Sequence, residues 1–262
     1  MVTRARLDAE LVRRGLARSR GQAAELIEAG RVAVRGIPAE KPATVVDRDT
    51  PVTVVATAER QWASRGAHKL IGALDALAVD PAGLRCLDAG ASTGGFTDVL
   101  LDRGAREVIA VDVGYGQLVW RLRSDARVRV HDRTNVRALT PAEIGGPAQL
   151  TVADLSFISL RTVLPALVAS TEGVLLPMVK PQFEVGKHRL GAGGVVRDPE
   201  LRLAALRDVA AAARELGLRL TGAVASPLPG PSGNVEFFLC LRRDVGDVGD
   251  DALSHAVEMG PS

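Results

Sequence analysis

Cysteine is scarce in this sequence: the chain has two, Cys86 and Cys240, and neither belongs to a CxxC motif. Two distant cysteines cannot build a disulfide scaffold, and they lack the spacing of zinc ligands. We therefore expect no structural disulfide and no bound metal, and a reducing compartment such as the cytoplasm as the setting.

Long apolar runs are also missing. The strongest run, residues 173–179, has the length of one buried strand, whereas a membrane-spanning helix needs about 20 apolar residues. The N-terminal segment MVTRARLDAE is basic but has no apolar stretch behind it, so the sequence predicts no secretory signal. With 47% hydrophobic and 24% charged residues, the composition is that of a globular protein.

Lysine is rare as well, since only four of the 33 basic residues are lysines: Lys41, Lys69, Lys180 and Lys187. Arginine keeps its proton in proteins, whereas a buried lysine can lose it. In a chain whose default cation is arginine, the lysines are therefore the candidates for a general base.

The net charge of +2 hides two segments of opposite sign. Residues 244–262 contain five acidic residues and no lysine or arginine, so the rest of the chain carries +7. Residues 1–20 hold six arginines against two acids. A basic N-terminal patch favours a polyanionic partner, nucleic acid first, although a solvated arginine-rich face explains the charge equally well.

Residues 1–57 are predicted to form a small α+β module. One helix is expected from Leu7 and a second after the capping residue Ser19, followed by short strands at residues 31–36, 44–46 and 52–55. The stretch RLDAELVRRGLARSRGQAAELIEAGRVAVRGIPAEKP resembles the S4 RNA-binding domain. In that family the helix pair and the following turn present basic side chains to structured RNA. The resemblance implies these RNA-binding residues: Arg4, Arg6, Arg18, Arg20 and Arg31.

Residues 58–66 are expected to be an interdomain linker, and residues 67–243 alternate between strand and helix patterns. This alternation predicts an α/β fold with a doubly wound parallel sheet. The last two strands, at residues 218–225 and 235–241, are expected to form a hairpin, which makes the final strand antiparallel. The acidic tail at residues 244–262 is expected to be disordered.

A glycine-rich turn, LDAGASTGGFT at residues 87–97, follows the first predicted strand of this sheet. Its glycines permit a tight turn and a close approach of the backbone to a ligand at a helix N-terminus. Asp112 ends the next strand, where an acid accepts hydrogen bonds from the ribose hydroxyls of an adenosine cofactor. Asp132 follows the third strand and either binds the adenine amino group or caps a loop. NAD and S-adenosylmethionine (SAM) both satisfy these features.

The stretches DAGASTGGFTDVLLDRGA and VDVGYGQL resemble two motifs of the FtsJ-like methyltransferases. The resemblance implies a class I (Rossmann-like) methyltransferase sheet and favours SAM over NAD. The implied cofactor-binding residues are Asp88, Gly90, Ala91, Ser92, Gly94, Gly95, Phe96, Asp112, Val113, Asp132, Arg133 and Asp154.

Four further residues are expected at the edge of the sheet where ligands bind. Asp154 and Lys180 end parallel strands, Glu236 begins an antiparallel strand, and Lys69 lies on the helix before the first strand. This order of lysine, aspartate, lysine and glutamate resembles the tetrad of RNA ribose 2′-O-methyltransferases. With the S4-like module, the whole chain resembles the TlyA (haemolysin A) family. That resemblance implies methylation of cytidine 2′-hydroxyls in the ribosomal RNA of the small subunit, the large subunit or both.

The chemistry agrees with this assignment. A ribose hydroxyl is a poor nucleophile until its proton leaves, and a neutral Lys180 amine can take that proton. Lys69 is a second cation that favours the neutral form of Lys180, whereas Asp154 and Glu236 orient the lysines and favour their protonated forms. The two effects oppose each other, and the four groups titrate as one unit.

Other interpretations stay open at this stage. A single lysine or glutamate at a strand end is usually a surface ion pair, so the tetrad depends on all four residues together. A non-catalytic RNA-binding protein can keep the same fold, and a membrane-active haemolysin or a nucleotide-dependent oxidoreductase are more distant alternatives. Methylation of an exocyclic amine is disfavoured, because DLSF (residues 154–157) stands after the fourth strand, where such enzymes typically have Asp/Asn-Pro-Pro-Tyr/Phe. Methylation of cytosine C5 is disfavoured, because neither cysteine lies in the loop after the fourth or the fifth strand.

Overall fold

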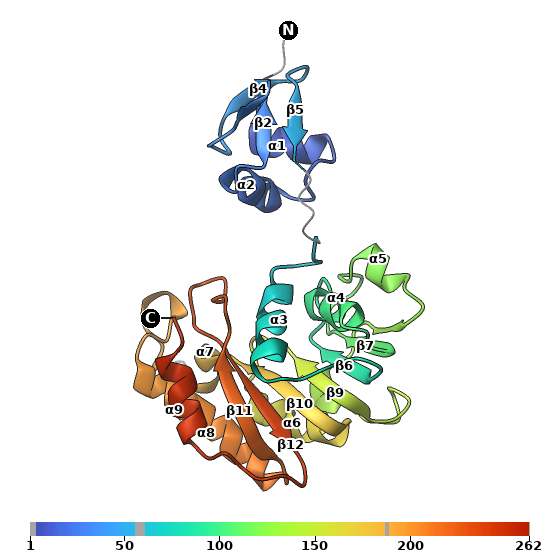
Figure 1. Cartoon of the computed structure of the whole chain (residues 1–262), viewed down its shortest axis with the longest axis vertical. Coiled ribbons are helices and arrows are strands. Elements are labelled where there is room, and N and C mark those ends of the chain that lie inside the picture. Colours follow the sequence, from blue (N-terminus) through green and yellow to red (C-terminus); the bar gives the residue numbers. More distant parts are fainter. Residues whose placement is uncertain (1–3, 56–60, 187–188, 262) are drawn as a thin grey trace. The chain divides into compact units, whose positions relative to one another are not determined.

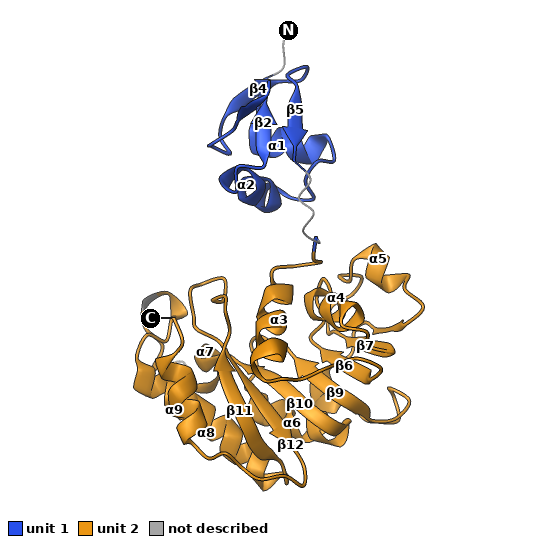
Figure 2. Ribbon diagram, viewed as in Figure 1, with its two compact units in different colours: residues 1–61 blue, residues 62–262 orange. Residues whose placement is uncertain are grey.

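The computed structural model describes residues 4–55, 61–186 and 189–261. The chain divides into two compact units, residues 1–61 and residues 62–262 (Figure 2). The division falls inside the linker predicted at residues 58–66. Residues 62–66 belong to the second unit, while residues 56–60 lie outside the described residues.

The described part of the first unit combines two helices with two small antiparallel sheets (Figure 1). The helices are α1 (Leu7–Arg13) and α2 (Arg20–Glu28). One sheet pairs β1 (Arg4–Arg6) with β4 (Val45–Asp47); the other joins β2 (Val32–Val34) to β3 (Ile37–Pro38) and β5 (Val52–Val54). The predicted cap of α2 is confirmed, because the Ser19 hydroxyl accepts a hydrogen bond from Gln22 N.

The second unit contains a seven-stranded sheet in the order β11-β12-β10-β9-β6-β7-β8. Its strands are β6 (Arg85–Ala89), β7 (Glu107–Val111), β8 (Val128–His131), β9 (Ala148–Ala153), β10 (Thr171–Val179), β11 (Arg219–Ala225) and β12 (Phe237–Arg242). The central strands pair in parallel, and β12 runs antiparallel to both of its neighbours. The predicted α/β sheet with an antiparallel last strand is therefore confirmed.

Helices cover both faces of this sheet (Figure 1). One core contains buried residues of α6 (Leu160–Ala169), α8 (Pro199–Glu215) and α9 (Asp251–Glu258). The other core contains buried residues of α3 (Gly66–Ala76), α4 (Gly95–Asp102) and the short α5 (Trp120–Arg123). Shorter helical segments of the described ranges include α7 (Pro181–Glu184), η1 (Val136–Ala138) and η3 (Ala192–Gly194). No helix in the described ranges is both long and apolar enough to cross a membrane.

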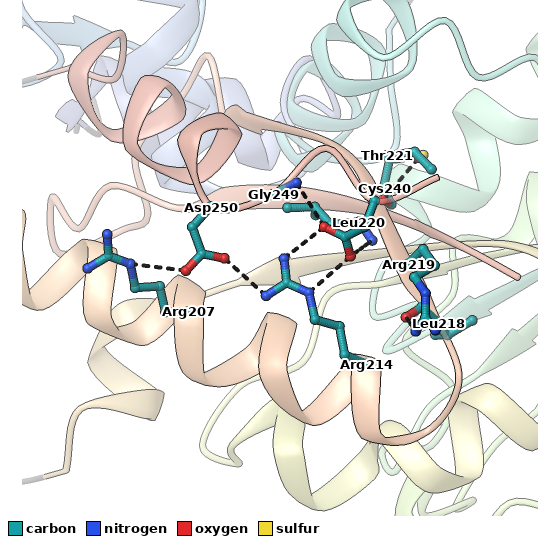
Figure 3. Close-up of polar contacts among 10 residues, drawn as sticks. Arg207, Arg214, Leu218, Arg219, Leu220, Thr221, Cys240, Gly249 and Asp250 are labelled. Carbon is teal, nitrogen blue, oxygen red and sulfur yellow. Dashed lines mark hydrogen bonds and ion pairs between the residues drawn. The ribbon is translucent and has the colours of Figure 1, made fainter. Parts of the chain in front are cut away.

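The expectation of a disordered acidic tail is wrong. Residues 251–258 form α9, which buries Leu253 and Ala256 in the core beside α8. Two of the acids before it have a basic partner, because Arg214 of α8 binds Asp250 (Figure 3) and Asp247. Asp247 also accepts a hydrogen bond from Leu220 N of β11 at 3.0 Å. Asp247 and Asp250 of this tail therefore anchor the segment that leads into a packed helix.

Candidate active site

A cavity of about 300 Å³ opens in the second unit at the carboxyl edge of the parallel strands. Its walls come from the start of α3, the turn after β6, the loop after β9, the end of β10 and the β11–β12 connection. The residues that line it are Ser64, Arg65, Gly66, Lys69, Gly90, Ala91, Ser92, Thr93, Gly95, Phe96, Asp154, Ser156, Lys180, Leu228, Pro229, Pro231 and Glu236. The four residues of the predicted tetrad thus meet at one cavity, although 167 positions separate Lys69 from Glu236.

The tetrad consists of two lysine–carboxylate pairs. Lys69 Nζ lies 2.5 Å from Glu236 Oε2, and Lys180 Nζ lies 2.5 Å from Asp154 Oδ1. Lys180 Nζ also donates a hydrogen bond to Ser156 Oγ at 2.9 Å. The lysine side chains are only 11% and 10% exposed, so both cations sit in a largely water-excluded site where charge interactions are strong.

Local structure explains how these side chains converge. Lys69 lies in the first turn of α3 on the face that also buries Ala67 and Leu70. Lys180 directly follows β10, while Glu236 directly precedes the antiparallel β12. Because β12 runs against its neighbours, its beginning lies at the same edge as the ends of the parallel strands.

The glycine-rich turn follows β6 and leads into α4. Gly90 adopts a φ of +90°, and a Cβ there would overlap the carbonyl oxygen of Asp154, so the close contact between two loops requires glycine. Gly94 caps α4 with a φ of +100°. A Cβ on Gly94 would overlap the side chains of Leu118 and Leu122, so this glycine also permits close packing against the segment that leads into α5.

Asp88 lies at the end of β6 and is completely buried. Its Oδ2 accepts a hydrogen bond from Thr97 Oγ1 at 2.6 Å, while its Oδ1 has no hydrogen-bond partner among the described residues. Burial raises the pKa of Asp88 to about 7; the carboxylates of Asp154 and Asp112 add to this effect, and the bond from Thr97 opposes it.

The remaining predicted cofactor residues follow β7 and β8 and do not line the cavity. Asp112 accepts hydrogen bonds from Ser92 N at 2.8 Å and from Gly114 N at 2.7 Å, which joins the glycine-rich turn to the next loop. Val113, beside it, is exposed.

Asp132 and Arg133 follow β8. Asp132 accepts a hydrogen bond from Arg123 at 2.8 Å, and this bond holds the pKa of Asp132 below its usual range. The guanidinium of Arg133 lies 4.3 Å from the centre of the Tyr115 ring. Neither residue is among those that line the cavity of the tetrad.

A second cavity of about 660 Å³ shares Ser156, Lys180, Pro231 and Glu236 with the first. From the sequence, Phe157 is expected either to line a target pocket or to pack in the core. Phe157 lies on the wall of this cavity with 91% of its surface exposed, and its ring centre lies 5.3 Å from that of Phe183. Ser156, which binds Lys180, was not among the predicted site residues. Its position two residues after Asp154 is the feature of the sequence that could have indicated a hydroxyl near Lys180.

In the first unit, the predicted RNA-binding residues occupy two places. Arg4, Arg6, Arg18 and Arg20 are exposed around β1 and the start of α2. Arg31 lies elsewhere, where its guanidinium donates to the Val55 carbonyl at 3.2 Å. Arg6 and Arg20 are brought together by a shared bond to Asp8.

Comparison with known proteins covers both units. A family model described as FtsJ-like methyltransferase matches residues 62–243, and one described as S4 domain matches residues 5–52. The chain is 63% identical to the 16S/23S rRNA (cytidine-2'-O)-methyltransferase TlyA of Mycobacterium tuberculosis, over the full length of both. It is 33% identical to Hemolysin A of Brachyspira hyodysenteriae, over 88% of this chain and 97% of that one.

A solved structure gives the same result for the fold. A protein from Streptococcus thermophilus that carries the name hemolysin superposes with a TM-score of 0.76 at 35% identity, covering 98% of this chain and 96% of the other. Since these matches run through both units, the chain belongs to the FtsJ-like methyltransferases and, within them, to the S4-domain enzymes of the TlyA family.

Proposed function

We propose that this protein methylates the 2′-hydroxyl of cytidine in ribosomal RNA, with SAM as the methyl donor and Lys180 as the general base. The observation that carries this proposal is the pair of lysine–carboxylate contacts at one cavity beside the glycine-rich turn. The relative from Mycobacterium tuberculosis, named for this reaction on 16S and 23S rRNA, supports the choice of substrate.

The residues around the turn fit SAM. The cavity volume of about 300 Å³ lies at the lower end of the range for small-molecule sites. The Asp112 carboxylate accepts one recorded hydrogen bond on each oxygen and has capacity for more, as binding of ribose hydroxyls requires. The unpartnered Oδ1 of Asp88 is a buried acceptor below the turn. Asp112, which is bonded to Ser92 of the cavity wall, would therefore hold the cofactor, with Asp88 buried below the turn and Asp132 as a further candidate contact. The cofactor supplies an electrophilic methyl group when bound.

Lys180 is the group best suited to take the proton from the ribose hydroxyl. Asp154 and Ser156 fix the direction of its amine through contacts of 2.5 and 2.9 Å. In its neutral form the amine accepts the proton while the oxygen becomes nucleophilic, and this step contributes about 10²- to 10⁴-fold in comparable enzymes.

Lys69 has a different role in this mechanism. Glu236 is 1% exposed and holds the ammonium of Lys69 in the same cavity wall. A fixed cation there stabilises the negative charge that develops on the ribose oxygen. The target nucleoside binds in the second cavity in this mechanism. That cavity shares Lys180 with the first and has room for a nucleoside beside Phe157.

The S4 domain supplies the affinity for the polyanion in this proposal. Arg4, Arg6, Arg18 and Arg20 are exposed on it, and guanidinium groups bind phosphates with paired hydrogen bonds. Arg31 is the fifth candidate contact.

The test is methyl transfer from labelled SAM to purified small and large ribosomal subunits from cells that lack this enzyme, beside naked ribosomal RNA. We expect label in 2′-O-methylcytidine after digestion to nucleosides. Lys180→Ala should abolish it, whereas the control His68→Ala, an exposed neighbour of Lys69, should retain it. Label on a base contradicts the proposed chemistry. SAM binding without transfer to any RNA would identify a non-catalytic RNA-binding protein.

A further inference from the structure

Asp8 in the S4 domain is an acid buried under two arginines. It lies in the first turn of α1, and its side chain is 6% exposed. Arg6, at the end of β1, donates to its two oxygens at 3.2 and 3.0 Å. Arg20, at the start of α2, donates to Asp8 Oδ2 at 2.9 Å, and Ala9 N completes the set at 2.8 Å. One carboxylate therefore joins two arginines from different elements.

The two guanidinium groups remain accessible in this arrangement. The side chains of Arg6 and Arg20 are 49% and 61% exposed. Among the described residues, no partner is found for NH1 of Arg6 or for Nε and NH1 of Arg20. Two guanidinium groups that bind the same carboxylate repel each other, and the negative charge of that carboxylate offsets the repulsion. The bond from Arg6 lowers the pKa of Asp8 to about 2, so the acid is ionised at neutral pH.

We propose that Asp8 is a positioning residue that holds Arg6 and Arg20 side by side as a binding site for one backbone phosphate of structured RNA. The inference rests on the proposed function and adds a specific site to it. A phosphodiester group has two free oxygens and one negative charge, which match two adjacent guanidinium forks. Asp8 contributes by fixing the rotamers of both arginines before the RNA arrives, which lowers the entropic cost of binding.

Glu10 provides a matched control on the same helix. It is also buried, and it also joins two arginines, Arg13 at 2.6 Å and Arg14 at 2.7 Å. Arg14, however, also donates hydrogen bonds to the backbone carbonyls of Thr50 and Arg48, and its side chain is only 19% exposed. This second cluster therefore holds the domain together internally and does not present two free guanidinium groups.

If Asp8 positions the two arginines, removing its negative charge should weaken the binding of RNA. Asp8→Asn removes a negative charge from a basic surface, so a simple charge argument predicts tighter binding of RNA. If Asp8 positions the arginines, the same variant binds RNA about 5- to 50-fold more weakly, because two long side chains must be ordered on binding. Glu10→Gln makes the same charge change and should stay within about threefold of the wild type.

The experiment measures the affinity of the full-length protein for two probes, unmethylated ribosomal subunits and total transfer RNA, with thermal unfolding to verify the fold. The decisive readout is a double-mutant cycle. In an Arg6→Ala/Arg20→Ala background, Asp8→Asn should no longer weaken binding, because the arginines that it orders are absent.

Each outcome bears on the proposal. Weaker binding by Asp8→Asn that disappears in the double-arginine background supports it. The proposal is contradicted if Asp8→Asn binds RNA as tightly as the wild type or more tightly. It is also contradicted if Glu10→Gln loses as much affinity as Asp8→Asn. In both cases the proposed function stands as long as the wild type binds subunits. Asp8-dependent binding of transfer RNA without binding of subunits keeps the phosphate site and overturns the ribosomal substrate. Failure of the wild type to bind either probe overturns both.

Discussion

Asp8 and Asp88 are two buried aspartates, one in each unit, with opposite electrostatic behaviour. Asp8 is surrounded by the guanidinium groups of Arg6 and Arg20, and the bond from Arg6 lowers its pKa to about 2. Asp88 has Thr97 as its recorded side-chain partner, and burial raises its pKa to about 7. Burial alone therefore does not decide the charge of a carboxylate; a cation within bonding distance does.

The difference matches the task of each unit. In the S4 domain Asp8 holds two cations that remain exposed, which suits a surface that attracts a polyanion. In the methyltransferase domain the two lysines of the tetrad are enclosed beside their carboxylate partners, and lysine is the cation that can serve as a base where arginine cannot. Glu236 shares one feature with each aspartate: it has a cation as partner, as Asp8 does, and the whole pair is buried, as Asp88 is. Changes at these carboxylates test the comparison.

The largest effect on stability is expected at Glu236. Glu236→Ala leaves the ammonium of Lys69 buried without its partner, which should lower the free energy of unfolding by about 3–5 kcal/mol. Removing both charges, as in Lys69→Met/Glu236→Leu, should recover most of this loss without restoring methyl transfer. Denaturant unfolding measures the first effect. A Glu236→Ala variant as stable as the wild type would show that Lys69 finds water or another partner.

The next effect is the pH dependence that Asp88 imposes. Its pKa of about 7 in the folded protein exceeds the unfolded value of about 4, so the folded state binds more protons between these values. Stability from this group is therefore lost as pH rises from about 4 to about 7, by about 2 kcal/mol between pH 5 and pH 7. Asp88→Asn should remove this slope in urea titrations at several pH values.

Asp8 provides the opposite slope and hence the control. Its lowered pKa means that its contribution to stability is present above about pH 4 and is lost only as pH falls towards 2. Asp8→Asn should therefore leave the slope between pH 5 and pH 7 unchanged. Identical pH profiles for the two variants would refute the contrast between the two aspartates.

A smaller effect is expected where the acidic tail joins α8. Asp247 accepts hydrogen bonds from Arg214, Leu220 N and Gly249 N. Asp247→Asn should lower the free energy of unfolding by about 1–2 kcal/mol, because charge-assisted bonds contribute more than neutral ones. It should also speed tryptic cleavage after Arg242 or Arg243. Glu258→Gln, an acid at the end of α9, serves as the control for the loss of a charge.

Much of the fold could be predicted from local patterns. The antiparallel position of β12 followed from the β11–β12 hairpin, and the convergence of Lys69, Asp154, Lys180 and Glu236 at one cavity followed from the rule that ligands bind at one edge of such a sheet. The tail is the exception. Five acids without a basic residue indicated disorder, since Arg214, the partner of Asp247 and Asp250, is more than 30 positions away.

The arrangement inside the site was beyond sequence patterns. The sequence gives no sign that Lys69 pairs with Glu236 and Lys180 with Asp154, because four charges allow several pairings and the backbone decides among them. The packing reason for Gly94 was equally hidden, since it depends on Leu118 and Leu122 of a later segment. The Asp8 contacts join residues 12 positions apart and needed the packed helix pair.

The central claim is that Lys180 acts through its ability to lose a proton. The most direct test compares Lys180→Arg with Lys69→Arg in single-turnover methyl transfer, with SAM and RNA binding measured alongside. Both variants keep a cation, but arginine cannot serve as a base. We expect a loss of about 10²- to 10⁴-fold for Lys180→Arg and a much smaller loss for Lys69→Arg. A Lys180→Arg enzyme that transfers methyl groups at nearly the wild-type rate would contradict this claim.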